Sequence, residues 1–131
     1  MGTMARTALD LTIQEWQTYH PGEVRDSADE GSSAVEMRWR EAWRVARSAA
    51  RMLRRQFGVR KVVVFGSLTH RMWFTPWSDI DLAAWGIPHD RFYMAVAAVT
   101  GLSAGFKLDL IDPATCRPAV REALEREGIE L

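Results

Sequence analysis

The chain has little of what secreted and membrane proteins depend on. Its 131 residues contain one cysteine, Cys116, so neither an intrachain disulfide nor a cysteine zinc cluster can form. No apolar run approaches the roughly 20 residues of a membrane span, and residues 1–16 lack the apolar core of a signal peptide. We therefore expect a cytoplasmic protein that does not associate with a membrane.

A net charge is also missing, because 17 Lys and Arg residues balance 17 Asp and Glu residues. This balance argues against a protein that is held to nucleic acid by bulk positive charge. The two signs are nevertheless separated along the chain. Residues 1–37 carry seven acidic and two basic residues, whereas residues 38–61 carry nine basic residues and one acidic residue.

Within the basic segment, arginines recur at alternating spacings of four and three, which places them on one face of a helix. This arginine stripe consists of Arg40, Arg44, Arg47, Arg51 and Arg54. The pattern is typical of a solvated helix face, and an acidic partner surface or an RNA backbone is the alternative. Nucleic acid is not the favoured partner, because Trp39 and Trp43 fall on the apolar side of the helix rather than on a face that stacks on bases.

The apolar pattern predicts one domain over residues 34–131. Before it, residues 1–33 are expected to form an N-terminal extension made of a short helix and an acidic loop, the loop covering residues 20–33. Residues 33–56 repeat apolar side chains at spacings of three and four, which predicts a long amphipathic helix.

Beyond this helix, strands and helices are expected to alternate. A β-branched run and two alternating segments predict three strands, at residues 61–65, 79–85 and 106–111. Further helices are expected at residues 90–102 and 113–127. The order predicts an α+β fold with α/β-type alternation, in which helices flank a small mixed sheet.

Two aspartates on the second predicted strand carry the first chemical signal. Because side chains alternate along a strand, Asp79 and Asp81 project from one face, while Ile80 and Leu82 point into the core. Neighbouring carboxylates repel each other, and a divalent cation removes that penalty. Hard oxygen ligands favour Mg²⁺ or Mn²⁺.

A third aspartate, Asp109, lies with Lys107 on the polar face of the last predicted strand. If the two strands pair with their polar faces aligned, Asp109 joins Asp79 and Asp81. Three carboxylates on one sheet face predict a two-metal site, with ions about 3.5–4 Å apart that serve a phosphoryl-type transfer.

The turn after the first predicted strand is suited to binding phosphate. Gly66 allows the backbone to approach a phosphate closely, Ser67 offers a hydroxyl, and a helix that starts there adds amide groups. Arg71, farther along the same loop, is a weaker candidate for a phosphate contact.

Together these residues resemble the signature of the nucleotidyltransferase superfamily, whose fold is that of polymerase β. The shared pattern is Gly-Ser, a spacer, Asp-x-Asp, and a later single Asp on a strand. The resemblance covers residues 62–112 and is closest to the minimal nucleotidyltransferases, the stand-alone single-domain branch. The spacer between Ser67 and Asp79 has eleven residues, one more than the commonest form, and it lacks the glycine usual in its middle.

The resemblance implies a role for each of these residues. Gly66 and Ser67 would hold the triphosphate of ATP, and Asp79 and Asp81 would coordinate the Mg²⁺ ions. Asp109 would help to bind the catalytic ion and would activate the acceptor hydroxyl. The reaction would transfer AMP to the acceptor and release pyrophosphate. The partner implied by the family is a HEPN-type toxin, which the nucleotidyltransferase silences as its antitoxin by adenylylation.

Two other functions remain open from the sequence. The long spacer could have weakened catalysis, which would leave an antitoxin of the same fold that acts by direct binding. Alternatively, the acceptor is a small molecule such as an aminoglycoside, or an RNA end. Such enzymes generally carry a further substrate domain, for which 131 residues leave little room.

Overall fold

In the computed structural model of the chain, residues 24–131 are described, with their side chains from residue 33 onward. The short helix predicted near the start therefore lies outside the described residues. The loop predicted for residues 20–33 is wrong from Val24 onward, because helix α2 spans Val24–Phe57. No proline interrupts this stretch, and extending an existing helix costs far less than nucleating one.

The remaining elements follow the predicted order, with bounds that differ by up to five residues. They are β1 (Lys61–Phe65), two short 3₁₀ helices (Gly66–Thr69 and Arg71–Trp73), β2 (Ile80–Trp85), a 3₁₀ turn (His89–Arg91), α3 (Phe92–Thr100), β3 (Leu108–Ile111), α4 (Pro118–Glu127) and β4 (Ile129–Glu130). The helix expected to start at Gly66 is a single 3₁₀ turn of four residues. The two-residue strand β4 was not predicted, because it is too short to show an alternating pattern.

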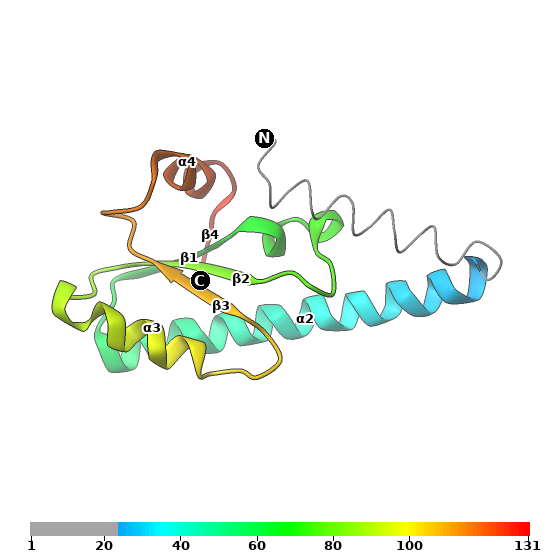
Figure 1. The fold of residues 1–131 in the computed structure, drawn as a ribbon, viewed down its shortest axis with the longest axis horizontal. Helices are drawn as coiled ribbons and strands as arrows, with labels where there is room; N and C mark the ends of the chain where they lie inside the picture. Colours follow the sequence, from blue (N-terminus) through cyan, green and yellow to red (C-terminus); the bar gives the residue numbers. More distant parts are fainter. Residues whose placement is uncertain (1–23) are drawn as a thin grey trace.

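The four strands form one mixed sheet in the order β3-β2-β1-β4. Strand β1 is antiparallel to both β2 and β4, and β2 is parallel to β3. The parallel pair is connected through α3, as parallel neighbours require a crossover. This arrangement confirms the predicted α+β class and the small mixed sheet (Figure 1).

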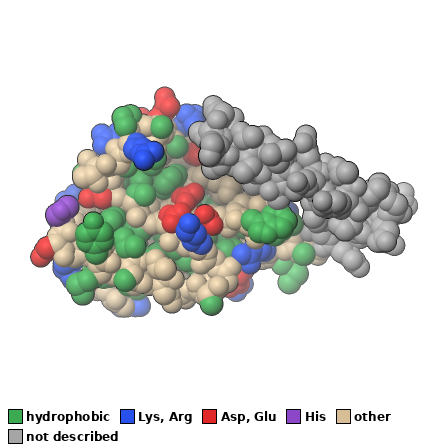
Figure 2. All heavy atoms as spheres, in the orientation of Figure 1, with side chains coloured by type: hydrophobic (Ala, Val, Ile, Leu, Met, Phe, Trp, Pro, Cys, Tyr) green, Lys and Arg blue, Asp and Glu red, His purple; other side chains and the backbone are tan. Residues whose placement is uncertain are grey.

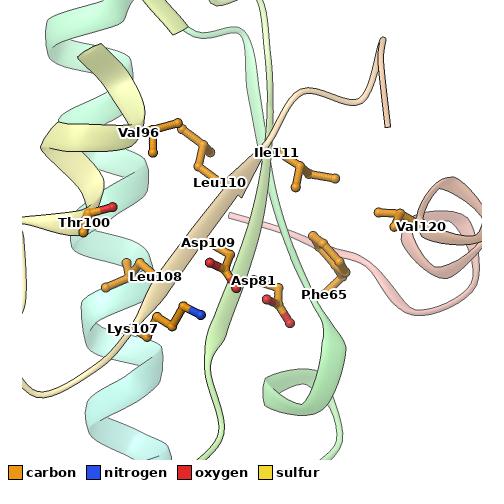
Figure 3. A pocket seen from close by; sticks show the side chains of 10 residues that line it. All are labelled: Phe65, Asp81, Val96, Thr100, Lys107, Leu108, Asp109, Leu110, Ile111 and Val120. Atoms are coloured by element: carbon orange, nitrogen blue, oxygen red, sulfur yellow. The ribbon is translucent and has the colours of Figure 1, made fainter. Parts of the chain in front are cut away.

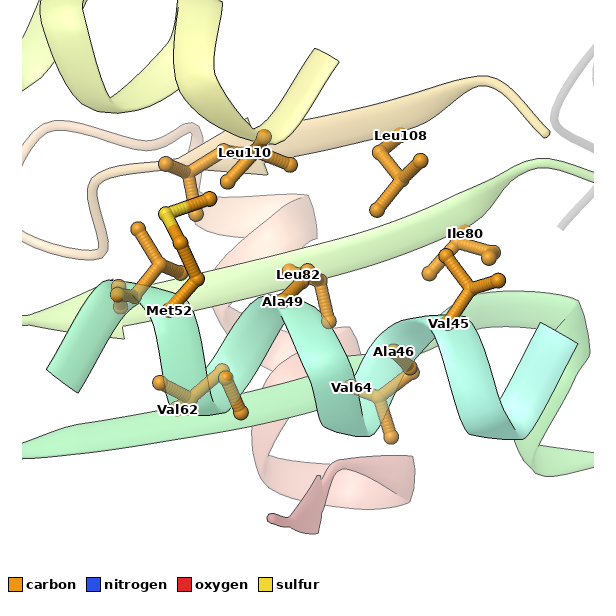
Figure 4. Close-up of a cluster of buried hydrophobic side chains, with 14 of the residues drawn as sticks. Val45, Ala46, Ala49, Met52, Val62, Val64, Ile80, Leu82, Leu108 and Leu110 are labelled. Atoms are coloured by element: carbon orange, nitrogen blue, oxygen red, sulfur yellow. The ribbon is translucent and has the colours of Figure 1, made fainter. Parts of the chain in front are cut away.

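One face of the sheet packs on α2 and α3 and forms the main core. Val62, Val64 and Leu82 point from the strands toward this core and are buried (Figure 4). The facing side of α2 contributes small residues, Ala46 and Ala49 among them, which let the helix lie close to the strands. The predicted apolar face of α2 is thereby confirmed.

The opposite face of the sheet is covered differently. Leu124 of α4 packs on Val63 and Ala83 in a small second cluster. Because α4 lies over β1, it covers only part of this face (Figure 1). Toward β3, Asp81 and Asp109 lie side by side in the register of the two strands. No helix among the described residues is both long and apolar enough to cross a membrane.

Candidate active site

The acidic residues predicted from strand alternation meet on the sheet face opposite α2. In the parallel register, Asp81 of β2 lies directly beside Asp109 of β3. Asp79 immediately precedes β2. Ile80 and Leu82 are fully buried on the other face, so the alternation that the sequence indicates is present. Figure 3 shows Asp81 and Asp109 side by side, with the Lys107 amine next to them.

The surroundings disfavour negative charge on these carboxyls. Burial raises the pKa of Asp81 to about 7, and the charges of Asp109 and Asp79 and a hydrogen bond with Asp109 act in the same direction. The pKa of Asp79 is also raised, mainly by burial and then by Asp109. Lys107 opposes both shifts. A single lysine is too little to compensate three carboxylates, so the site retains affinity for additional positive charge.

The donors present are of the kind that Mg²⁺ and Mn²⁺ prefer, since all three are carboxylates. In the part of the chain with described side chains, no three His, Cys, Asp or Glu side chains converge closely enough to hold one metal ion. The structure therefore offers a paired Asp81–Asp109 unit with Asp79 beside it. The chemistry of this donor set fits a divalent cation.

Gly66 brings the backbone at the end of β1 against the acidic pair. Its φ of +83° lies in the left-handed region, and an added Cβ would lie 2.5 Å from Oδ2 of Asp81. Only glycine satisfies both conditions without strain. Next to it, Ser67 is half-buried, and its hydroxyl makes no hydrogen bond with another described residue. The turn and the acids thus form one continuous site.

An open hollow of about 470 Å³ runs alongside β3 at this site (Figure 3). Phe65, Asp81, Lys107 and Asp109 are among its lining residues. On the surface, acidic side chains gather near the centre of one face, with a basic side chain against them (Figure 2). The hollow gives a ligand access to the acidic pair.

No protein-family profile matches the chain, and no curated protein matches its sequence. Solved structures do resemble it. A mutant of the MntA–HpeT toxin–antitoxin matches 65% of this chain and 69% of its own, with a TM-score of 0.52 and 18% identity. A second MntA–HpeT mutant has a TM-score of 0.52 at 14% identity over 65% and 70% of the two chains. A toxin–antitoxin structure with AMP-PNP has a TM-score of 0.51 at 16% identity over 63% and 69%.

MntA is a minimal nucleotidyltransferase antitoxin. The chain has the nucleotidyltransferase fold. At these identities the likeness concerns the fold alone, so the roles of individual residues depend on their geometry here.

Within the nucleotidyltransferase fold, α2 fixes the two loops that precede the acids. Arg38 donates hydrogen bonds to the carbonyl oxygens of Pro76 (2.9 Å) and Gly105 (2.7 Å). Its guanidinium also lies over the Phe106 ring, 4.0 Å from the centroid. Pro76 lies three residues before Asp79, and Gly105 lies four residues before Asp109. The Arg38 side chain therefore contacts both loops that lead into the acidic residues.

Arg71 does not face the acidic pair in this structure. Its Nε donates to Oε1 of Glu36 at 2.6 Å, and its guanidinium lies toward the ring of Trp39. A phosphate contact by Arg71 stays a prediction, and it would require this ion pair to open.

Two residues at the site had no role assigned from the sequence. Lys107 lies on the same strand face as Asp109, and the two-residue spacing between them is the sequence signal that could have identified it. Glu127, the last residue of α4, accepts a hydrogen bond from the Gly66 amide (3.2 Å), and its Oε1 lies 3.5 Å from Nε2 of His70. No sequence signal could have found Glu127, because it lies 61 residues from Gly66.

Proposed function

We propose that the chain is a Mg²⁺-dependent nucleotidyltransferase that transfers AMP from ATP to a hydroxyl of a partner protein. The observation that carries this proposal is the placement of Asp81 beside Asp109, with Asp79 next to the pair and Gly66 against it. The AMP-PNP in a similar structure supports a nucleotide as the ligand. The reaction would take place in the cytoplasm, where ATP is available.

In this mechanism the Gly66 amide and the Ser67 hydroxyl hold the triphosphate. Asp79, Asp81 and Asp109 would hold Mg²⁺, or Mn²⁺ in its place, and the ion when bound would supply positive charge that stabilises the reacting phosphate. Asp109 accepts the proton of the acceptor hydroxyl, whose oxygen forms a bond to the α-phosphorus as the bond to pyrophosphate breaks.

The proposed acceptor is a HEPN-type toxin, which would make this chain its antitoxin. The three solved structures above, all toxin–antitoxin pairs or their mutants, support this assignment. Exposed apolar side chains on the loop between Ser67 and Asp79 favour a protein acceptor, because such side chains mark protein contacts when they gather. They are Met72 (83% exposed), Trp73 (43%) and Trp77 (65%).

The test is incubation of the chain with labelled ATP, Mg²⁺ and a purified HEPN-type toxin protein. We expect label on the partner, and we expect Asp109→Asn to abolish it. Asp112→Asn is the matched control, because Asp112 lies in the following turn, where Oδ1 accepts a hydrogen bond from the Ala114 amide. Asparagine retains that acceptor, so labelling should persist. Equal labelling by both variants would overturn the proposed role of Asp109.

A second candidate is an antitoxin of the same fold that acts by binding alone. It is favoured by the finding that, in the described residues, no three ligating side chains converge on one point. A stable complex with the partner, without transfer of label, would select this candidate over the enzyme.

A further inference from the structure

The Gly66 amide, which is expected to bind phosphate, already donates a hydrogen bond to a carboxylate of this chain. Glu127 accepts a hydrogen bond from the Gly66 amide through Oε2, at 3.2 Å. The Glu127 side chain is only 12% exposed, and its other oxygen lies 3.5 Å from Nε2 of His70. A carboxylate and a phosphate oxygen are both acceptors for a backbone amide, so they compete for this one donor.

The fold holds Glu127 at this position rather than leaving it on a free helix end. Immediately after it, Gly128 packs so closely that an added Cβ would lie 2.5 Å from the Leu124 carbonyl oxygen and 2.6 Å from a methyl of Val63. The next residue, Ile129, then pairs with Val64 of β1 in the sheet. The backbone of Glu127 is thereby fixed next to the end of β1, and only its side chain can turn away.

We propose that Glu127 is a resident anion of the nucleotide site, which a ligand must displace from the Gly66 amide in order to bind. This inference rests on the proposed function, because it concerns the same triphosphate. A displaced carboxylate still has His70 as a neighbour, whose side chain is 41% exposed and packs on Trp73 with ring centroids 4.0 Å apart.

Because Glu127 must be displaced, only a ligand that gains enough from the rest of the site binds at the Gly66 amide. A ligand with one phosphate group can replace a single hydrogen bond and must then lie beside the Glu127 charge. A triphosphate that carries its own divalent cations brings positive charge with it and makes further contacts along the site. Glu127 therefore disfavours weak anions more than it disfavours a metal-bound triphosphate.

The experiment measures the affinity of the full chain for AMP-PNP with Mg²⁺ by calorimetry. Glu127→Gln keeps an acceptor for the Gly66 amide and removes the charge. We expect it to bind AMP-PNP about tenfold more tightly, which is the difference between a hydrogen bond to a charged acceptor and one to a neutral acceptor. Glu122→Gln is the matched control, because Glu122 lies on the same helix with its side chain 75% exposed, and it should bind as the unaltered chain does.

The affinity of Glu127→Gln relative to the other two proteins supports or overturns the role of Glu127. Tighter binding by Glu127→Gln alone supports the resident anion, even if the unaltered chain shows no measurable binding. Unchanged or weaker binding shows that Glu127 is neutral or supports the ligand, and it overturns this inference while leaving the proposed function in place. Absence of AMP-PNP binding by all three proteins overturns both. Thermal unfolding of each variant checks that the fold is retained.

Discussion

At the scale of single residues, folding strongly raises the pKa of Asp81. It rises from an ordinary 3.8 to about 7, because burial and the charges of Asp109 and Asp79 disfavour its ionised form. Between these two values the folded chain binds more protons than the unfolded chain does. Stability without divalent cations therefore falls as pH rises from about 4 to 7, and the loss is complete above that range.

Asp81→Asn removes this penalty, because asparagine does not ionise. We expect its melting temperature at pH 8 to exceed that of the unaltered chain by at least about 5 °C, with little difference at pH 4. Thermal unfolding at both pH values, without divalent cations, measures this. Added Mg²⁺ at pH 8 should narrow the difference, because it stabilises only the chain that keeps the carboxylate. A variant that is less stable than the unaltered chain at pH 8 contradicts the conclusion that the ionised Asp81 destabilises the fold.

Gly66 gives a second prediction, in which backbone strain and steric clash can be separated. Gly66→Ala should destabilise the chain by about 2–4 kcal/mol, since it combines a left-handed φ with a Cβ 2.5 Å from Asp81. Gly58→Ala is the control, because Gly58 has a φ of +65° and open space where its Cβ would lie. Denaturant unfolding of both variants measures the difference. Equal losses would mean that the contact with Asp81 relaxes without cost.

At the scale of elements, α2 positions the site although it contributes no acid to it. Arg38→Ala removes two hydrogen bonds from a charged donor, to Pro76 and Gly105, each worth about 1.5–3 kcal/mol. We expect a clear loss of stability and a fall in AMP transfer of at least about tenfold, because the loops before Asp79 and Asp109 lose their common anchor.

Arg40→Ala serves as the control for this helix, because the Arg40 side chain is 72% exposed and pairs only with Glu36 among the described residues. Surface ion pairs of this kind contribute little, so both stability and transfer should change slightly. The same transfer assay and thermal unfolding apply to both variants. If Arg38→Ala unfolds like the unaltered chain and keeps full transfer, Arg38 does not position the loops.

The elements also show which parts of the fold and site the sequence could predict. Strand alternation placed Asp79 and Asp81 on one face and Asp109 on the polar face of its own strand. That Asp109 lies beside Asp81 depends on the parallel register of β2 and β3, which the sequence left as a condition. Local patterns could not show that the chain after Gly66 forms only a 3₁₀ turn, since tertiary packing decides that. Nor could they show the contact of Glu127 with Gly66, which depends on how α4 folds back onto β1.

At the scale of the whole molecule, the zero net charge is a sum of unlike segments, since residues 38–61 carry nine basic residues and one acidic residue while the rest of the chain is net acidic. The arginine stripe predicted on α2 is exposed along its length, at Arg40, Arg44, Arg47, Arg51 and Arg54. The acidic pair lies on the far side of the sheet from α2, since the face that packs on α2 is apolar. The chain thus presents a basic helix and an acidic site on different sides of one core.

This separation predicts that the arginine stripe does not tune the site. An α-helix is about 10 Å across and the sheet lies beyond it, so the distance from the arginine stripe to the acidic pair exceeds the Debye length of about 8 Å at 0.15 M ionic strength.

Reversing the charge at both Arg47 and Arg51 should therefore leave the affinity for AMP-PNP with Mg²⁺ within about twofold of that of the unaltered chain. Stability should also change little, because both side chains are exposed. The interactions removed are a hydrogen bond from Arg51 to the Ser48 hydroxyl and a distant contact of the Arg47 guanidinium with the Trp43 ring, 6.0 Å from the centroid. Calorimetry at about 0.15 M and about 0.02 M salt measures this affinity. Only at the lower salt does the screening length grow enough for the arginine stripe to act on the site. A change in affinity of about fivefold at the higher salt would mean that α2 and the site are coupled by direct packing rather than by long-range charge.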